Sequence, residues 1–481
     1  MCSFLVLNYI LKNYELANKY QKSRGPDLTS DLFYKNFTFV HNLLNVTGEI
    51  TKQPFVNEEN NIVVVFNGEI YNYKEFGDYS SDGYCLIDLY LKYGNDFIKY
   101  LDGEFAIVLV DFNNRKIIIS SDVFGTKPIW YGKGPKRIGI SSYKSALDSE
   151  EIKNVVFLNP NTTKIFEMDT LEEIEENRVY EFNFRQFKNS YDDYINALVE
   201  SIKKRTNTKS SISVGLSSGY DSGVICCLLN SLDIDYRTYS IKGKENMNVL
   251  SDRIHKNNSN FLIVDLQLET INNELKNLKE NCERYEYQHQ PGIGLLDDMA
   301  SVGLSVITNE ARGDGVKIVL SGSGADEILC DYAREGKKIM NHSCFKGVFP
   351  KDLSEILDND PSKNMVWKSF YHGTMRDYLM KDEIISGLHG IEGRYPYLDK
   401  NVVQEFLNLS VELKNKYKGP LEEIFKRYDY PFEHKKIGFN ITNKYTKVDE
   451  SGNVCIVDKP IPLIPPKYLK MNSKILLKKK I

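Results

Sequence analysis

The sequence lacks the patterns of zinc sites, disulfide frameworks and membrane spans. Its eight cysteines are scattered over 481 residues without C-x-x-C spacing, and its seven histidines form no H-E-x-x-H cluster. No stretch reaches the roughly 18 consecutive apolar residues of a membrane-spanning helix. We therefore expect reduced thiols, a cytoplasmic location, no zinc site and no membrane partner.

The sequence has no excess of positive charge, and we expect no signal peptide in its apolar opening. The net charge is −4 and the pI is near 6.1, so electrostatics gives no reason to expect nucleic acid as a partner. The apolar opening at residues 2–7 has no basic segment before it and no small-residue cleavage site after it, and we interpret it as a buried strand. The composition is that of a globular chain with room for two or three domains.

The Walker pattern G-x-x-x-x-G-K-[ST] is also absent, but a different phosphate loop is present. Residues 217–222 read Ser-Ser-Gly-Tyr-Asp-Ser, after an apolar strand at 212–216 and before an apolar run. Such a loop lets backbone N–H groups approach a pyrophosphate, and the helix start adds a favourable dipole. Without the Walker lysine, the loop suits ATP cleavage at the α-phosphate. The alternative for the loop alone is a strand-to-helix turn without a ligand.

A second apolar strand ends in a similar loop, at Ser321-Gly322-Ser323-Gly324, and closes on the acid pair Asp326-Glu327. Asp221 and Asp326, at two such strand ends, are suited to hold Mg²⁺ against triphosphate oxygens, because hard cations prefer oxygen ligands. The alternative for either aspartate alone is a helix N-cap.

The start of the chain carries a candidate nucleophile. Removal of Met1 would expose Cys2 as an N-terminal residue with thiol and base together. Downstream, an apolar strand at 62–66 delivers Asn67-Gly68, whose amide and backbone N–H are suited to an oxyanion hole. The alternative for Asn-Gly is a hairpin turn.

Residues 390–399 and 434–439 add a carboxylate, an arginine and lysines that could serve a reacting carboxyl group and a departing pyrophosphate. The alternative for these two segments, taken without the other motifs, is that their charged side chains simply lie on the protein surface. In their order and spacing, all these segments resemble the glutamine-hydrolysing asparagine synthetase family from Met1 to about Phe439. The likeness is carried by residues 24–27, 66–72, 81–82, 101–106, 122–128, 217–222, 320–327 and 392–399.

The resemblance implies a two-domain enzyme. Residues 1–180 are expected to form an α+β class II glutamine amidotransferase domain with four α/β/β/α layers and antiparallel sheets. Residues 190–445 are expected to form an α/β synthetase domain of the adenine-nucleotide α-hydrolase type with a parallel sheet, and residues 446–481 a tail. Small-molecule substrates, ATP and Mg²⁺ follow from the family, and a homodimer is compatible with it.

The family's functional residues carry over position by position. Cys2 matches the glutaminase nucleophile, and Glu392 and Lys436 match residues at the acyl-adenylate centre. The other matches are Asn67 and Gly68 for the oxyanion hole, Asn67, Glu69 and Asp82 for glutamine, Ser217, Ser218, Gly219, Asp221, Ser222, Ile241, Ser321 and Gly322 for ATP, and Asp221 and Asp326 for the metal.

Two positions depart from the family pattern. Leu43 stands where an arginine is expected to bind the glutamine carboxylate, and its loss would weaken glutamine binding by about 1.5–3 kcal/mol unless Lys52 or Arg24 substitutes. Ser323 stands where asparagine-forming members carry glutamate, and serine is a poor general base. An apolar passage for ammonia between the two sites is also expected.

Three functions follow as hypotheses. The leading one is asparagine synthesis from aspartate with glutamine or ammonia as the nitrogen donor. The second, favoured by Ser323 and Leu43, is an amide ligase of the same superfamily acting on a peptide, sugar acid or amino-acid derivative. The third is a relative that binds nucleotide without turnover. The argument against it is that the chain retains Cys2, Asp221, Asp326 and Glu392.

Local periodicity predicts individual elements. We expect strands at 62–66, 104–112 and 116–121, with the last two joined as a hairpin, and helical structure at 83–100 and 191–204. The acidic stretch near 168–190 has two open interpretations, an interdomain linker or an edge hairpin that completes the first domain.

Overall fold

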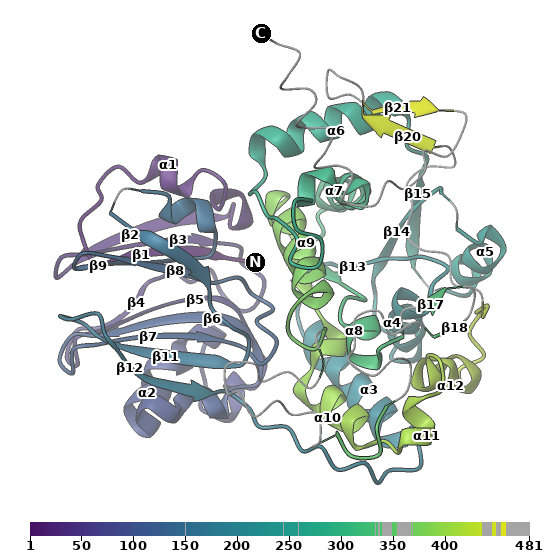
Figure 1. Cartoon of the computed structure of the whole chain (residues 1–481), viewed down its shortest axis with the longest axis horizontal. Helices are drawn as coiled ribbons and strands as arrows, with labels where there is room; N and C mark the ends of the chain where they lie inside the picture. The colour runs from purple at the N-terminus through teal and green to yellow at the C-terminus, as the bar shows by residue number, and fades with distance from the viewer. Residues whose placement is uncertain are drawn as a thin grey trace.

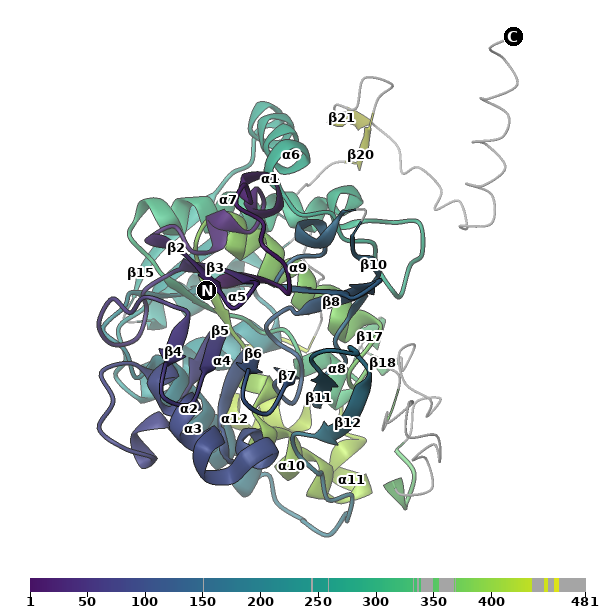
Figure 2. The ribbon, with the colours of Figure 1, turned by 90° about the vertical axis from the view of Figure 1, so that its left-hand side faces the viewer.

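The computed structural model describes residues 1–149, 151–243, 245–257, 259–331, 349–353, 367 and 369–434, and the backbone of four short strands. These strands are β17 (Ala333–Arg334), β18 (Lys337–Lys338), β20 (Tyr445–Val448) and β21 (Val454–Val457). Two halves lie side by side: antiparallel sheets in the amino-terminal half and a parallel sheet with helices in the other (Figure 1). Seen from the side of the antiparallel sheets, the second half lies behind them (Figure 2).

The first sheet has the predicted buried strand β1 near its centre. Its strand order is β10-β8-β9-β1-β3-β2, and all its neighbours pair antiparallel. All residues of β1 are buried, which confirms the interpretation of the apolar opening. The strands are β1 Ser3–Leu7, β2 Leu28–Tyr34, β3 Phe37–Leu43, β8 Trp130–Gly134, β9 Arg137–Ser141 and β10 Lys153–Phe157.

The second sheet, in the order β12-β11-β7-β6-β5-β4, contains the three predicted strands. Its strand β5 continues past residue 66 to Ile70, so Asn67 and Gly68 lie inside a strand and not in a turn after it. The hairpin of β6 and β7 is confirmed, with Asp111 opposite Lys116. The strands are β4 Phe55–Asn57, β5 Ile62–Ile70, β6 Gly103–Asp111, β7 Lys116–Ser121, β11 Thr162–Glu167 and β12 Glu173–Arg178.

The two sheets pack face to face on an apolar layer that includes Phe4, Val6, Val63 and Val108. Alternate residues of the strands point the other way, toward the helical layers, as the two-residue period of a strand requires. Helix α2 (Cys85–Tyr93) covers the second sheet, while α1 (Glu15–Asn18) and η5 (Lys144–Leu147) lie over the first. The expected α/β/β/α layering is thus present (Figure 1).

Two predicted elements differ in detail from the expectation. The helix expected at 83–100 ends at Tyr93, because Gly94 adopts φ +59° and the chain continues as the 3₁₀ segment η4 (Gly94–Tyr100). In the acidic stretch, β12 pairs with β11 as the outermost strand of the sheet, so the edge-hairpin interpretation is correct up to Arg178. The connection to the second half follows at residues 179–190.

The second half is built on a parallel sheet with the order β15-β14-β13-β16-β19. Its strands are β13 Ile212–Gly215, β14 Arg237–Ile241, β15 Asn260–Val264, β16 Ile318–Leu320 and β19 Glu392–Arg394. Because the strands are parallel, their carboxyl ends meet at one edge, where the loops after β13 and β16 lie next to each other. This adjacency places the two predicted phosphate and metal loops together.

Helices cover both faces of this sheet. One apolar cluster joins β13 to α3, α4, α10 and α12, and another joins β14 to α6, α7 and α9. The predicted amphipathic helix at 191–204 is confirmed as α3. The helices are α3 Asp192–Thr206, α4 Tyr220–Ser231, α5 Met247–Lys256, α6 Leu268–Asn281, α7 Met299–Gly313, α8 Ala325–Leu329, α9 Thr374–Leu388, α10 Lys400–Asn408, α11 Val411–Lys414 and α12 Gly419–Arg427.

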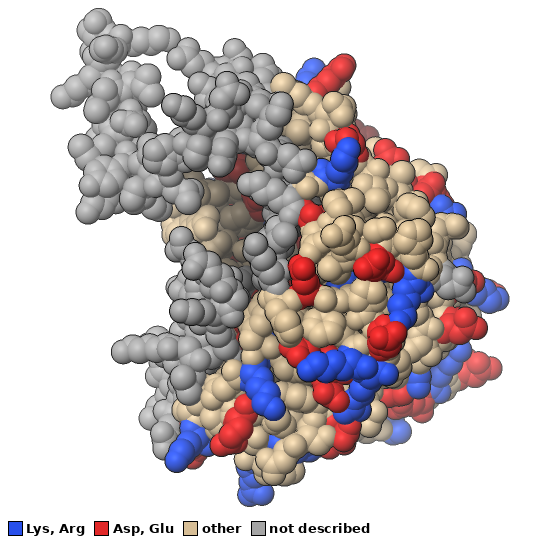
Figure 3. All heavy atoms as spheres, turned by 90° about the vertical axis from the view of Figure 1, so that its right-hand side faces the viewer, with Lys and Arg blue, Asp and Glu red and all other residues tan. Residues whose placement is uncertain are grey.

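The charged side chains and the thiols occupy different parts of the molecule. On the face shown in Figure 3, positive and negative side chains are interspersed among neutral ones. In the described part of the chain, no helix is long and apolar enough to span a membrane. Cys2, Cys85, Cys226, Cys227, Cys282 and Cys330 are all buried free thiols.

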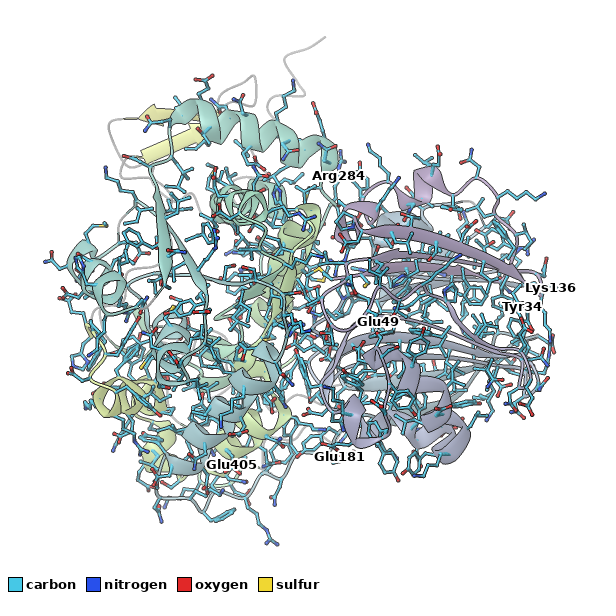
Figure 4. The ribbon with its side chains drawn as sticks, turned by 180° about the vertical axis from the view of Figure 1, so that it is seen from behind. Tyr34, Glu49, Lys136, Glu181, Arg284 and Glu405 are labelled. Carbon is cyan, nitrogen blue, oxygen red and sulfur yellow. The ribbon has the colours of Figure 1, made fainter. Side chains whose placement is uncertain are left out.

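Buried charges join the two halves. Arg24 of the first half contacts Glu383 of α9 through Nη2 and Oε2 at 2.8 Å, and both side chains are fully buried. Lys127 also reaches Glu383, with Nζ to Oε1 at 3.0 Å, and Tyr395 donates its hydroxyl to the same carboxylate at 2.8 Å. A second buried ion pair across the junction joins Arg205 of α3 to Glu104 of β6, with Nε to Oε1 at 2.7 Å. Figure 4 shows the junction from behind, with Glu49 beside it and Tyr34 and Lys136 at the far end of the sandwich.

Glu383→Gln should therefore destabilise the folded chain strongly. The substitution removes the negative charge that compensates Arg24 and Lys127, and an uncompensated buried charge costs about 3–5 kcal/mol. Glu173→Gln, in the partly exposed pair with Lys164 on edge strand β12, is the matched control and should change the free energy by at most about 1 kcal/mol. Denaturant unfolding measures both, and equal losses in the two variants would contradict the assignment.

Candidate active site

Cys2 lies at the junction of the two halves, directly before β1. Its side chain is buried, its Sγ lies 3.8 Å from the carbonyl oxygen of Leu44, and its own carbonyl accepts a 3.0 Å hydrogen bond from Arg24 Nε. Burial raises the pKa of the Cys2 thiol to about 11, because the thiolate loses its hydration. A nucleophilic role therefore needs a base beside the sulfur, which the α-amine of an N-terminal cysteine would supply.

Asn67 and Gly68 have the features of an oxyanion hole. The amide of Asn67 is fully buried, and among the described residues neither its oxygen nor its nitrogen has a hydrogen-bond partner. An unpartnered buried amide is rare and calls for an explanation such as a ligand. Gly68 has φ +133°, and a Cβ at this position would lie 1.9 Å from the carbonyl oxygen of Glu104. Only glycine fits there, and the Asn67 amide remains available to a substrate oxygen.

A cluster of buried charges lies beside this pair and combines both halves of the chain. The guanidinium of Arg394, in β19, contacts Glu69 at 3.3 Å and Glu392 at 2.8 Å. The amine of Met1 lies 3.0 Å from the other oxygen of Glu392. Asp82 accepts the backbone N–H of Ile70 at 2.9 Å. The carboxyl groups of Glu69, Asp82 and Glu392 thus outnumber the two cations.

This imbalance determines which carboxyl groups hold protons. Burial raises the pKa of Glu69 to about 8, although Arg394 acts in the opposite direction, and burial raises the pKa of Asp82 to about 6. Burial also acts against the ionised form of Glu392, but the adjacent amine and Arg394 outweigh it and hold its pKa below the usual range. Arg394 is hydrogen-bonded to Glu392, so its charge favours that carboxylate and Glu69 is the group that keeps a proton near neutral pH.

The missing arginine is not replaced by either residue proposed for it. Leu43 is buried at the end of β3, opposite Leu28. Arg24 is already bound to Glu383 and to the Cys2 carbonyl, and Lys52 is exposed. Arg394 is the guanidinium beside Glu69. The sequence analysis assigned this arginine to the reacting carboxyl group or the pyrophosphate, because it comes from the other half of the chain.

The loop after β13 binds an anionic group of the protein itself. The carboxylate of Glu245 accepts the backbone N–H of Ser218 at 2.7 Å and also its hydroxyl. Ser222 accepts the Ser217 N–H at 3.0 Å, and below the loop Arg253 donates to the Ser217 carbonyl at 2.7 Å. The loop can thus bind an anionic oxygen through a backbone N–H and a hydroxyl, as a pyrophosphate cradle would require, and the cradle itself stays a prediction.

Asp221 and Asp326, the two residues predicted as metal ligands, meet around the ammonium of Lys418. The ammonium of Lys418, which directly precedes α12, contacts Oδ1 of both aspartates at 2.5 Å. Lys418 is fully buried, and nothing in its sequence context pointed to this position between two aspartates. Among the described residues, no group of three or more His, Cys, Asp or Glu is arranged to hold a metal. The two carboxylates fit Mg²⁺ provided that phosphate and water supply the other ligands.

The remaining ATP-site residues lie at the same edge of the sheet. A Cβ on Gly322 would lie 2.9 Å from the Cβ of Asp221, so the loops after β13 and β16 are in close contact. Ile241 is the buried last residue of β14, which pairs with β13. Seven of the eight predicted ATP-site residues belong to these two loops or to the start of α4, and Ile241 completes the set.

Glu392 is not brought to these loops. It is the first residue of β19 and pairs with Ile318, the first residue of β16, so it lies at the opposite end of the sheet from Ser321. There it contacts the Met1 amine and Arg394, which places it with Cys2 and not with the expected adenylate centre. Lys436 lies outside the described residues.

The side chains that connect Cys2 with the loop after β16 make polar contacts. Arg24 joins the Cys2 carbonyl to Glu383 of α9, and Asp382, the neighbour of Glu383, contacts the loop after β16. The apolar passage for ammonia stays a prediction.

Comparison with known proteins connects both halves to described families. Residues 1–182 match the model of a glutamine amidotransferase domain, and residues 193–454, more than half of the chain, match that of asparagine synthase. A putative glutamine-hydrolysing asparagine synthetase 1 of Methanocaldococcus jannaschii is 28% identical over 473 residues, covering 86% of this chain and 81% of its own. The glutamine-hydrolysing asparagine synthetase 1 of Saccharomyces cerevisiae is 24% identical over 459 residues, covering 85% of this chain and 74% of its own.

Glu69→Gln should flatten the dependence of stability on pH. The folded-state pKa of about 8 lies above the unfolded value, so the folded chain binds a proton that the unfolded chain has released, and stability falls as pH rises between these values. Thermal unfolding between about pH 5 and pH 8 should show this fall in the unsubstituted protein and a smaller one in the variant. Glu59→Gln, at an exposed turn, should keep the original slope. A slope unchanged by Glu69→Gln would place the retained proton elsewhere.

Proposed function

The chain belongs to the asparagine synthase family, and on that premise we propose that it makes asparagine from aspartate in an ATP-dependent reaction. Glutamine or ammonia supplies the nitrogen, and a β-aspartyl-AMP intermediate releases pyrophosphate when it forms and AMP when it reacts. The observation that carries the proposal is the pair of touching loops, the first of which binds a carboxylate through the N–H of Ser218, while each loop contributes one aspartate to a shared cation. A cytoplasmic location, a homodimer and the domain division at residues 1–180, 190–445 and 446–481 belong to the same proposal.

In the glutaminase reaction, the Cys2 thiolate attacks the carboxamide carbon of glutamine. A carbon–sulfur bond forms, the carbon–nitrogen bond breaks, and ammonia leaves after taking the proton that the α-amine received from the thiol. Asn67 and Gly68 hold the oxyanion of the tetrahedral intermediate, and the unpartnered amide of Asn67 supports this role. Glu69 and Asp82 bind the polar end of glutamine. Water then releases glutamate from the thioester.

In the synthetase reaction, Ser217, Ser218, Gly219 and Ser222 bind the β- and γ-phosphates of ATP after the Glu245 carboxylate has moved away. Asp221 and Asp326 would hold Mg²⁺, which would supply positive charge to the triphosphate oxygens. Lys418 lies beside both aspartates and neutralises the pyrophosphate as it leaves, with Lys436 as a second cation. Ile241, Ser321 and Gly322 line the nucleotide.

Glu392 has a different proposed role from the one that the resemblance implied. Its contacts with Arg394 and, before Met1 is removed, with the Met1 amine suit a carboxylate that positions the amino-terminal segment beside Glu69. A substrate other than aspartate is the second candidate function. It is favoured by Ser323 and by Leu43, which are the two departures from the family pattern.

Pyrophosphate release with Mg-ATP, aspartate and a saturating ammonium salt tests the proposed reaction. Release that depends on aspartate, together with AMP and asparagine, is the expected result. Asp221→Asn should lower this rate by at least about 100-fold, because the triphosphate loses one of its metal-holding carboxylates. Asp233→Asn, at the exposed turn after α4, is the control. No stimulation by aspartate, with melting still raised by Mg-ATP, would favour the amide ligase of another carboxylate.

Cys2→Ala should separate the two nitrogen sources. The variant loses the nucleophile, so glutamine-dependent asparagine formation should fall to background while ammonium-dependent formation stays within about twofold. Cys85→Ala, a buried thiol in α2, controls for the loss of a thiol as such. Glutamine-dependent turnover that survives Cys2→Ala would exclude Cys2 as the nucleophile.

A further inference from the structure

Helix α9 carries two neighbouring carboxylates, Asp382 and Glu383, that contact different parts of the protein. Glu383 faces the junction, where it contacts Arg24 and Lys127. Asp382 is directed to the loop after β16, where its Oδ2 accepts hydrogen bonds from the hydroxyl of Ser321 at 2.6 Å and from that of Ser323 at 2.7 Å. A carboxylate from a distant part of the sequence thus lies against the loop whose own expected acid is missing.

The geometry leaves one oxygen of Asp382 available. Both serine hydroxyls donate to Oδ2, and none of the described residues donates to Oδ1. The side chain is partly exposed, as are Ser321, Gly322 and Ser323. Burial within the fold raises the pKa of Asp382 even though the two serines oppose it. A higher pKa makes the carboxylate a better proton acceptor.

Asp382 also lies close to the proposed adenylation centre. The loop that it contacts approaches the phosphate loop so closely that a Cβ on Gly322 would lie 2.9 Å from the Cβ of Asp221. The other carboxylate that the resemblance placed here, Glu392, lies at the opposite end of the sheet. Asp382 is therefore the described carboxylate that contacts the loop after β16 from outside that loop, whereas Glu245 lies on the loop after β13.

We propose that Asp382 is the general base of the amide-forming step, in place of the carboxylate missing at position 323. The inference rests on the proposed function. The attacking nitrogen forms a bond to the carbonyl carbon of the acyl-adenylate, the bond from that carbon to the AMP oxygen breaks, and AMP leaves with the electron pair. The proton that the nitrogen loses passes to Oδ1 of Asp382. Ser321 and Ser323 position the carboxylate.

Two half-reactions test this role separately. In a single turnover with Mg-ATP and aspartate but no nitrogen donor, Asp382→Asn should release pyrophosphate at the unsubstituted rate and with the same dependence on aspartate concentration. When ammonium is then added, asparagine formation should be at least about 100-fold slower than in the unsubstituted protein. Asp382→Glu should recover part of that rate, because it restores a carboxylate.

Matched variants separate a base from a structural residue. Glu310→Gln removes an exposed carboxylate of α7 and should change neither half-reaction. Ser323→Ala keeps the carboxylate and removes one of its donors, so it should slow amide formation by less than Asp382→Asn does. The melting temperature of each variant is measured alongside.

Three results would overturn the assignment. Amide formation at the original rate in Asp382→Asn would show that another group takes the proton. A higher aspartate concentration for half-maximal pyrophosphate release would make Asp382 a substrate-binding residue. Parallel loss of both half-reactions together with a lower melting temperature would make its role structural. If the unsubstituted protein releases no pyrophosphate with aspartate, the proposed function fails first, and this inference fails with it.

Discussion

Glu383 is the point on which the arrangement of the two halves depends. Its carboxylate has almost no contact with water and compensates Arg24 and Lys127 from the amino-terminal half, while Tyr395 donates to it from the segment after β19. A buried charge is stable only when its partners are held in place, so this group fixes how the halves meet. Arg24 in turn donates to the Cys2 carbonyl, and the neighbour of Glu383 reaches the loop after β16. One helix thus positions residues at both candidate sites.

Charged groups of the protein lie at the synthetase loops where we propose that ligands bind. Glu245 binds where phosphate oxygens are proposed to bind, and Lys418 lies between the two aspartates proposed as metal ligands. Each of these two charged groups satisfies polar groups that would otherwise be costly to bury. Substrate binding in the proposed reaction therefore exchanges one set of ion contacts for another, and does not fill an empty space.

The glutaminase side follows a different principle. There the amide of Asn67 is buried without a partner, and three carboxyl groups share two cations, so the cluster keeps a proton. Arg394 from the other half supplies the positive charge beside Glu69. The absence of an arginine at position 43 and the presence of Arg394 together give this cluster a charge balance that depends on the contact between the halves.

Much of the fold could be predicted from the sequence because it depends on local pattern. Alternating or continuous apolar runs identified β1, β5, β6 and β7, the helical period identified α3, and the small-residue loops after β13 and β16 were recognisable from their composition. The end of α2 at Gly94 and the strand position of Asn67 and Gly68 were not predicted, since both depend on backbone angles and pairing partners.

The sequence by itself determined the family, the two kinds of sheet and the loops at the carboxyl ends of β13 and β16. Only the tertiary structure decided the positions of Glu392, Lys418, Arg394 and Asp382. Strand direction turned Glu392 away from the synthetase loops, and long-range packing brought Lys418 and Asp382 to them. The physical reason is that charges separated by many residues find their partners through the fold, and no local pattern in the chain records those pairings.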